Sequence, residues 1–340
     1  MNKNQFCISK KALFGLIVIL LLSLFIFFIS KTNQNKKILS SKAAPPKIIG
    51  GHPAEPGEWP FMVALYDGRE EDLSKIRDAT FCNGFLISDE YVLTAAHCLY
   101  RPTDDTFRYL IKRDKSEIKI AIGYNDLTDI KNVKDSSKLL APVEGYVINP
   151  GFNYKFYYNK QIESEDFERE AAYFNEDIAL LRIKKINSFY FVNYKAISLS
   201  NNEKIISPGF PVAILGWGGT ESNISSNVLY EGFNTIYSNK RLVNYQNKNI
   251  YDNKILVKNF PYAYFGDSGG PIIAYSPTLK KWFVIGVSSW IDPGNKSSYF
   301  TNLIYHLSWI KQITSIEPNK GSFKGKSPDR ITPTPNLRRR

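Results

Sequence analysis

Short apolar runs separated by turn-forming residues dominate the chain between residues 61 and 290. The runs are rich in Val, Ile, Tyr and Phe, and Gly, Pro, Asn and Asp interrupt them. Such short runs bounded by turn formers are typical of the strands of an all-β fold. We expect strands at 61–66, 81–87, 91–95, 118–122, 143–148, 178–181, 211–219, 229–236, 255–259, 272–275 and 282–290, and an amphipathic segment at 303–313.

One apolar run near the N-terminus is much longer. Residues 12–29 are 18 apolar or small residues in succession, preceded by Lys10 and Lys11. As a helix they would extend about 27 Å, enough to span a bilayer. The run is longer than the usual apolar region of a signal peptide, and no A-x-A pattern follows closely. We therefore favour a membrane anchor with the rest of the chain outside the cytoplasm; a signal peptide within residues 1–30, cleaved to leave a secreted or periplasmic protein, is the alternative.

A polar segment follows, residues 31–47, and it ends in Pro45-Pro46-Lys47. Directly after it comes the sequence IIGG at 48–51. Cleavage after Lys47 would free the ammonium group of Ile48, which can be buried only beside a carboxylate such as that of Asp267. Taken alone, residues 31–47 are also compatible with an ordinary stalk or linker.

Composition and charge limit the class of protein. The chain has 340 residues, of which 43% are hydrophobic and 14% aromatic, as in a globular protein with a sizeable core. Residues 1–47 contain eight Lys and no acidic residue, and residues 318–340 contain seven basic residues and one Asp. The whole-chain charge of +12, less the +14 of these two tails, leaves −2 for residues 48–317. A nucleic-acid partner is therefore not expected, because a protein that binds nucleic acid carries its basic surface on the folded domain. Residues 318–340 are predicted to be a disordered basic tail.

The three cysteines agree with export from the cytoplasm. Cys7 precedes the apolar run, whereas Cys82 and Cys98 lie within the main body. A bridge between the latter two would stabilise the fold by roughly 3 kcal/mol in an oxidising compartment, and two free buried thiols remain the alternative. The sequence has no cluster with metal-ligand spacing, so we expect neither a metal nor another cofactor.

Three separate motifs carry candidate chemistry. The loop GDSGGP at 266–271 places Ser268 among small residues that let the backbone approach a substrate. His97 ends the small-residue stretch TAAH, and Asp177 begins the apolar run DIALL. Each has an ordinary explanation by itself: a surface turn, a structural histidine and a strand cap. Together they supply a nucleophile, a base and a group that orients the base. His52 and His306 are interpreted as structural or solvated.

These motifs resemble the chymotrypsin/trypsin family of serine proteases. The resemblance covers about residues 48–315 and rests on IIGG, TAAHC, DIALL, GWG, GDSGGP and SSW in this order. It implies an all-β fold of two antiparallel six-stranded β-barrels with the active site between them, and a C-terminal helix. With the preceding segments it predicts four parts: residues 1–30, an apolar anchor helix or signal peptide; 31–47, a stalk or propeptide; 48–317, the protease domain; and 318–340, the tail.

The resemblance also implies roles for single residues. Ser268 would attack the scissile carbonyl, His97 would act as base and then acid, and Asp177 would orient His97. The N–H groups of Gly266 and Ser268 would bind the oxyanion. The remaining implied pairs are the activation pair Ile48 and Asp267 and the disulfide between Cys82 and Cys98.

The chain departs from the family at the pocket for the substrate side chain, where Ser289 and Trp290 match the family. Tyr262 stands where trypsin-like members have a pocket-floor Asp, Tyr264 replaces a half-cystine, and Ile291 follows Trp290 in place of Gly. Without a buried acid a Lys or Arg side chain would be unpaired, so we expect a preference for small or aliphatic residues and no self-activation at Lys47.

The sequence thus predicts a serine endopeptidase made as a zymogen. Its expected partners are a polypeptide substrate, a separate activating protease, and a membrane if residues 12–29 are retained. The alternative is a catalytically silent binding or regulatory module on the same fold.

Overall fold

The computed structural model describes residues 48–103, 110–132, 140–152, 176–185, 194–219, 226–239, 241–245, 248–252, 254–321 and 323–327. All of them belong to one compact unit, 46–340, and the predicted anchor and stalk, residues 1–47, lie outside the described residues. Within the described ranges, no helix has the length and apolar character needed to cross a membrane.

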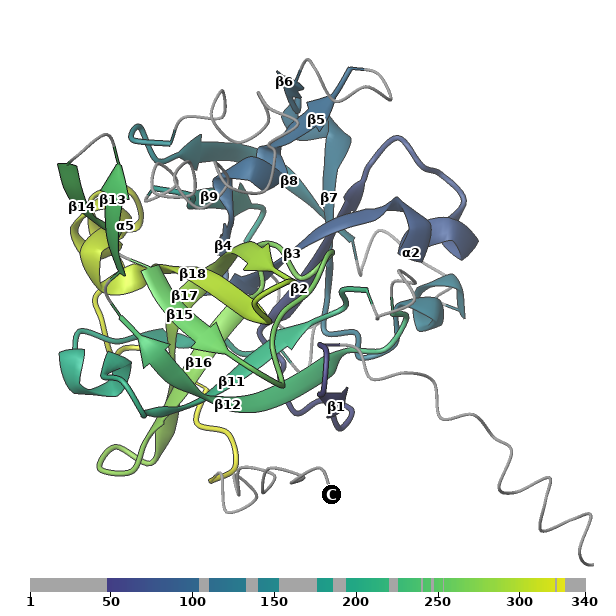
Figure 1. The fold of residues 1–340 in the computed structure, drawn as a ribbon. Coiled ribbons are helices and arrows are strands. Elements are labelled where there is room, and N and C mark those ends of the chain that lie inside the picture. The colour runs from purple at the N-terminus through teal and green to yellow at the C-terminus, as the bar shows by residue number, and fades with distance from the viewer. Residues whose placement is uncertain are drawn as a thin grey trace, which may run out of the picture. The chain divides into compact units, whose positions relative to one another are not determined.

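Two closed barrels of six antiparallel strands each make up the unit (Figure 1). The first barrel consists of β2 (Met62–Asp67), β3 (Thr80–Leu86), β4 (Tyr91–Thr94), β9 (Ala179–Ile183), β8 (Leu140–Ile148) and β7 (Ile118–Ile122). The second consists of β11 (Pro211–Gly216), β16 (Pro271–Ser276), β17 (Lys281–Asp292), β18 (Ser297–Asn302), β15 (Lys254–Lys258) and β12 (Tyr230–Ser238), and the β12–β15 pairing closes it. The expected fold class is therefore confirmed for the barrels.

Smaller elements surround the barrels. β1 (His52–Pro53) pairs with β12, and β10 (Ser198–Leu199) pairs in parallel with β17. The remaining strands are β5 (Tyr100–Pro102) with β6 (Leu110–Lys112), and β13 (Arg241–Tyr245) with β14 (Lys248–Asp252). The helices are η1 (Leu73–Lys75), α2 (Ile76–Ala79), η2 (Ala96–Leu99), η3 (Lys115–Glu117), η4 (Leu127–Asn132), η7 (Glu203–Ile206), η8 (Leu303–His306) and α5 (Leu307–Thr314). The last two form the short C-terminal helix expected over 303–313.

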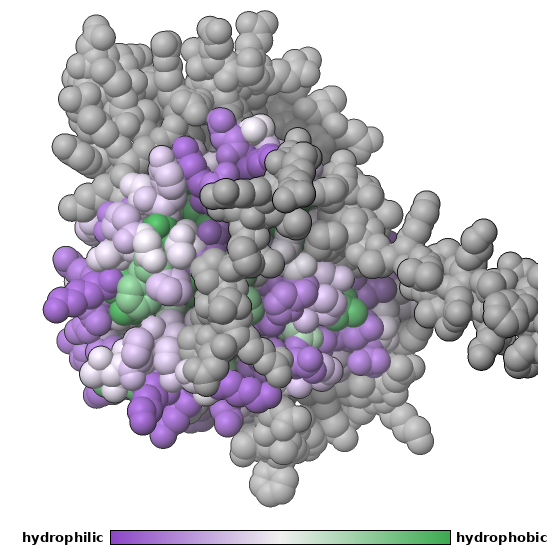
Figure 2. All heavy atoms as spheres, turned by 60° about the horizontal axis from the view of Figure 1, so that its bottom comes forward, coloured by the Kyte–Doolittle hydropathy of each residue, from purple (hydrophilic) through white to green (hydrophobic). Residues whose placement is uncertain are grey.

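Hydrophobic burial explains why the strands lie where the apolar runs predict them. Strand β2 (MVALYD) is buried at five of its six positions, and β11 (PVAILG) is also buried at five. Fully burying each aliphatic side chain contributes about 1.5–3 kcal/mol. On the face seen in Figure 2, hydrophobic side chains form small separate areas among hydrophilic ones. The apolar surface of the strands is thus used mainly inside the barrels.

The segment after α5 differs from the expected disordered tail. Backbone hydrogen bonds join Asn319 to Leu199 and Phe323 to Ala196, and the Phe323 ring packs edge-on against Phe61 at 5.0 Å. Residues 318–321 and 323–327 therefore belong to the folded body. The rest of the predicted tail, 328–340, lies outside the described residues.

Candidate active site

His97 lies on a rigid support. It is the second residue of η2, a short helix whose four residues are all buried, directly after strand β4 of the first barrel. A disulfide joins Cys82 in β3 to Cys98 in η2, as expected. His97 itself is 7% exposed, and its Nε2 lies 3.9 Å from the Cys98 sulfur. The cross-link therefore fixes the backbone on which the imidazole is carried.

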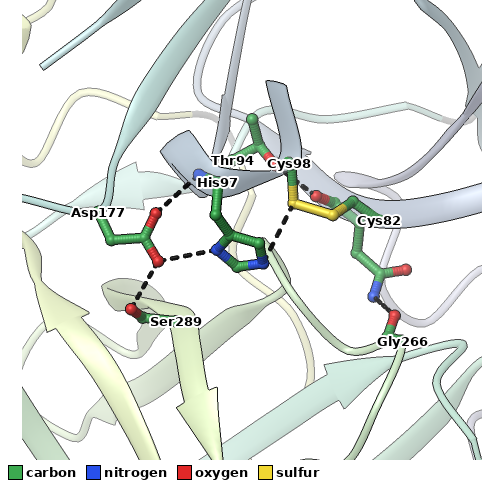
Figure 3. The surroundings of a disulfide bond; sticks show 8 residues. Cys82, Thr94, His97, Cys98, Asp177, Gly266 and Ser289 are labelled. Atoms are coloured by element: carbon green, nitrogen blue, oxygen red, sulfur yellow. Dashed lines mark hydrogen bonds and ion pairs between the residues drawn. A yellow bond between two sulfur atoms is a disulfide. The ribbon is translucent and has the colours of Figure 1, made fainter. Parts of the chain in front are cut away.

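Asp177 holds His97 at two points (Figure 3). Its Oδ1 accepts a hydrogen bond from the His97 backbone N–H at 2.9 Å, and its Oδ2 lies 2.9 Å from His97 Nδ1. Asp177 is fully buried two residues before β9, and it also accepts a 2.6 Å hydrogen bond from the Ser289 hydroxyl in β17. Two residues of the first barrel and one of the second therefore meet at this carboxylate.

The charge of Asp177 is maintained by its neighbours. Burial raises the pKa of this carboxyl, but the His97 ring, the Lys254 ammonium and the Ser289 hydroxyl outweigh it and lower the pKa below its usual value. An ionised carboxylate on Nδ1 favours the ring form that carries its proton there. In that ring form Nε2 is the basic nitrogen of the imidazole.

The loop carrying Ser268 packs against the segment that leads into His97. The Asn83 backbone N–H donates to the Ser268 carbonyl at 2.8 Å. Gly269 has φ +78°, and a Cβ there would lie 2.3 Å from Thr94 Oγ1, so only glycine fits. No direct hydrogen bond joins the side chains of Ser268 and His97, both of which are described residues. Such bonds are often long without substrate and tighten in the complex.

Asp267, beside the candidate nucleophile, is a buried carboxyl group that accepts backbone hydrogen bonds. It is 0% exposed, and it accepts 2.8 Å hydrogen bonds from the backbone N–H groups of Gly218 and Tyr264. Burial raises the pKa of Asp267 to about 7 even though both of these bonds lower it. Two backbone hydrogen bonds do not compensate fully for the burial of this charge, so a cation would be stabilised beside it.

The start of the folded body is docked in the second barrel. Ile48 is fully buried in the core around Val212 and Ile214, and its φ is +49°. Ile49 exchanges two backbone hydrogen bonds with Tyr262, of 3.0 and 3.1 Å. These contacts bring the IIGG segment next to the residue that would line the base of a substrate pocket.

The residues expected to form that pocket lie on neighbouring strands. Ser289, Trp290 and Ile291 are consecutive in β17, and Ile291 pairs with Ser298 in β18. Tyr262 is 4% exposed. Ser298 is fully buried and its hydroxyl donates to the Ala263 carbonyl at 3.2 Å. Ile291 and Ser298 therefore lie side by side where the resemblance to the family predicts the pocket. Sequence patterns alone do not indicate a role for Ser298.

Three further residues of the site were also missed. Asn83, Lys254 and Thr301 are buried polar residues within strands, and each hydrogen-bonds to a residue of the site or to one that contacts it. In the sequence, each of them is marked only as a polar residue within a largely apolar strand. His306, expected to be structural or solvated, is buried and lies 3.3 Å from Glu176.

One cluster of metal-ligating residue types occurs among the described residues, namely Cys82, His97 and Cys98. Its two sulfur atoms are bonded to each other, so they offer no thiolate to a metal ion.

Comparison with known proteins agrees with this geometry. A family model described as Trypsin matches residues 48–310. The mouse (Mus musculus) protein named Transmembrane protease serine 11C is 26% identical over 284 residues, which cover 79% of this chain and 54% of that protein. The chain thus spans about half the length of this curated relative. Because the family model covers more than half of the chain, from the IIGG segment to the C-terminal helix, the chain belongs to the trypsin family of serine proteases.

Proposed function

We propose that the protein is a serine endopeptidase that uses Ser268, His97 and Asp177. The observation that carries this proposal is the two-point contact of Asp177 with His97, which directs Nε2 of the ring away from the carboxylate. In the first step Nε2 takes the Ser268 proton while Oγ forms a bond to the scissile carbonyl carbon. The imidazolium then gives this proton to the leaving amine, and an acyl-enzyme remains. Water, deprotonated by His97, releases the acid and restores Ser268.

The developing oxyanion would be bound by the backbone N–H groups of Gly266 and Ser268. Gly266 has φ +90°, which a residue with a side chain rarely adopts. This conformation supports a loop whose N–H groups face the substrate. Such preorganised donors are worth about 3–4 kcal/mol in the transition state.

The pocket residues support a small or aliphatic preference for the residue before the scissile bond. Tyr262 takes the sequence position of the family's pocket floor, where it cannot neutralise a cation, and Ile291, which pairs with Ser298, would add a side chain to the wall. An unpaired Lys or Arg side chain there would be costly to desolvate. A protease of another specificity is therefore proposed to cleave after Lys47.

That cleavage would convert a zymogen of residues 1–340 into the active domain. Three features support it: Ile48 is buried, its φ is in a region that strains a β-branched residue, and no cationic side chain of the described residues acts on Asp267. Cutting the 47–48 bond removes the constraint on this φ and creates an ammonium group at Ile48. We further propose that residues 12–29 hold the protein to a membrane with the protease domain outside, as the name of the mouse relative suggests for that protein.

A fluorophosphonate probe tests the proposal. The chain is cleaved at 47–48 by an added protease, and covalent labelling is compared with that of the Ser268→Ala variant. We expect labelling of the cleaved wild-type chain alone, with peptide hydrolysis favouring small or aliphatic residues. A folded, cleaved chain that is not labelled would establish the alternative, a silent binding module on the protease fold.

A further inference from the structure

A buried lysine lies behind the candidate catalytic carboxylate. Lys254 begins strand β15, directly opposite Thr301 of β18 in the antiparallel register. It is 2% exposed, and burying an ammonium group costs several kcal/mol unless acceptors surround it. Its Nζ donates to Thr301 Oγ1 at 2.8 Å and to Ser289 Oγ at 3.1 Å.

Both acceptors are in turn donors to Asp177. The Ser289 hydroxyl donates to Asp177 Oδ2 at 2.6 Å, and the Thr301 hydroxyl donates to the Asp177 carbonyl at 3.0 Å. A lysine ammonium has donors only, so each hydroxyl oxygen must accept from Lys254. The single proton of each hydroxyl is thereby left to point at Asp177. The chain of donors therefore runs in one direction, from Lys254 through a hydroxyl to the carboxylate residue.

Three further titratable groups lie near the Asp177–His97 pair among the described residues. Lys254 lies in β15, Glu176 precedes Asp177 in the chain, and His306 of η8 lies 3.3 Å from Glu176. Lys254 lowers the pKa of Asp177, whose burial acts in the opposite direction, and it likewise opposes the effect of burial on the pKa of Glu176. Among the described residues, Lys254 is thus the cation other than His97 that lowers the pKa of Asp177.

We propose that Lys254 is a positioning residue for the reaction: it orients the Ser289 and Thr301 hydroxyls toward Asp177, and its charge moderates the attraction of Asp177 for protonated His97. This inference rests on the proposed function of the triad. A buried ammonium gives no more stability than a well-packed apolar side chain. The specific effect of the Lys254 ammonium is therefore on the electrostatic potential at the Asp177 carboxylate, where a second cation disfavours protonation of His97.

Two substitutions separate charge from orientation. Lys254→Met has a similar length but neither charge nor donors, whereas Lys254→Gln keeps two N–H donors without the charge. In the cleaved enzyme, we expect both to move the acidic limb of the kcat/KM profile to higher pH by about one unit, the scale of one removed charge at an effective dielectric constant near 20. Only Lys254→Met is expected to lower the plateau kcat as well, several-fold and without a change in KM.

Lys258→Met is the matched control, because Lys258 ends the same strand and lies over the Tyr237 ring at 4.5 Å. It removes the same charge and should leave both the limb and the plateau unchanged. An unshifted limb in a folded Lys254→Gln or Lys254→Met variant would overturn the proposal, as would an equal shift in Lys258→Met. If Lys254→Met does not fold, the Gln variant alone decides the role of the charge.

A measurement without turnover distinguishes this inference from the proposed function. The protonation midpoint of the His97 ring is followed by NMR in the cleaved wild-type chain and in Lys254→Gln. A midpoint raised by about one pH unit supports the inference even if fluorophosphonate labelling fails. Labelling of the wild-type chain with an unchanged midpoint overturns the inference and leaves the proposed protease intact.

Discussion

The side-chain amide of Asn83 donates a 2.8 Å hydrogen bond to the carbonyl oxygen of Gly266, 183 residues further along the chain. Asn83 is fully buried in β3 of the first barrel, and Gly266 belongs to the loop of the second barrel that carries Ser268. The backbone N–H of Asn83 holds the same loop through the Ser268 carbonyl. Side chain and backbone of one residue thus fix the loop that is proposed to bind the oxyanion.

Substituting Asn83→Ala should therefore impair catalysis more than binding. A hydrogen bond of this kind contributes about 1 kcal/mol, and the loss falls on the loop conformation required in the transition state. We expect kcat and the fluorophosphonate labelling rate of the cleaved enzyme to fall roughly fivefold, with KM unchanged. Asn202→Ala, which removes an exposed helix-capping side chain of η7, is the control and should leave both rates intact. Equal rates for Asn83→Ala and wild type would show that the loop needs no such anchor.

The segment after α5 should stabilise the domain rather than form a tail. Phe323 is 5% exposed and its ring packs against Trp59 and Phe61, while the Trp282 indole N–H donates to the Lys326 carbonyl at 2.9 Å. Removing a buried phenylalanine side chain costs about 3 kcal/mol or more. Phe323→Ala and truncation after residue 317 should each lower Tm by several degrees.

Truncation after residue 327 is the matched control for this prediction. It removes most of the basic residues of the tail but keeps the packed segment, so Tm should remain that of the full chain. A Tm unaffected by truncation after residue 317 would contradict the packing described.

The disulfide should matter for activity as well as for stability. It joins residues separated by 16 positions and carries His97 immediately beside Cys98. Closing a loop of this size contributes roughly 3 kcal/mol. In Cys82→Ser/Cys98→Ser we expect a lower Tm, and at temperatures where the variant remains folded a reduced kcat, because the imidazole support is looser. Each single variant serves for comparison; a double variant with normal kcat and Tm would refute this role.

The strands could be located from the sequence wherever apolar runs coincide with burial. For β7 the expected and observed bounds, residues 118–122, are identical. Strand β18 (SSYFTN) was missed although all six of its residues are buried. Its Ser298 and Thr301 are polar side chains that satisfy their hydrogen bonds with distant backbone carbonyls. Hydrophobic periodicity cannot detect such a strand, because its burial depends on partners that only the fold supplies.

The same limit separates the candidate site residues that the sequence predicts from those that it does not. His97, Asp177 and the Ser268 loop lie in motifs of distinctive local composition, so they were recognisable without knowledge of the fold. Lys254 could not be recognised in this way, because an isolated lysine at a strand end is normally solvated. Its burial follows from its register opposite Thr301 and from the proximity of Ser289, neither of which sequence spacing reveals.

Glu231 should make the stability of the domain pH-dependent. Burial raises its pKa to about 7, and the nearby Glu58 and Glu55 act in the same direction, against the Trp59 hydrogen bond and the His52 charge. The carboxyl ordinarily titrates near 4.5. Its raised value means that its contribution to stability is fully present below about pH 4.5 and is lost as the pH rises through about 7.

In the wild-type chain the Trp59 indole N–H donates to Glu231 at 2.7 Å. Glu231→Gln removes the titration of this side chain, while the Gln amide oxygen can still accept the same hydrogen bond. The difference in unfolding free energy, variant minus wild type, should therefore increase from pH 5 to pH 8. Glu203→Gln, at an exposed position of η7, is the control and should show a nearly constant difference. A constant difference for Glu231→Gln would mean that this carboxyl is not buried in solution.

Cleavage after Lys47 should stabilise the domain through Asp267. In the uncleaved chain burial raises the pKa of Asp267 to about 7, so its contribution to stability declines as the pH rises through that value. A free Ile48 ammonium beside the carboxylate would lower the pKa of Asp267 and restore the contribution of this residue to stability.

We expect the cleaved chain to melt several degrees above the uncleaved one, with a difference in Tm, here called the gap, that widens from pH 6 to pH 8. The measurement is calorimetry in a Ser268→Ala background, which prevents self-digestion. Asp267→Asn should abolish the pH dependence of the gap and most of the gap itself, because the ammonium then has no charged partner. A gap that persists in Asp267→Asn would assign the stabilisation to release of the strained Ile48 backbone instead of to the ion pair.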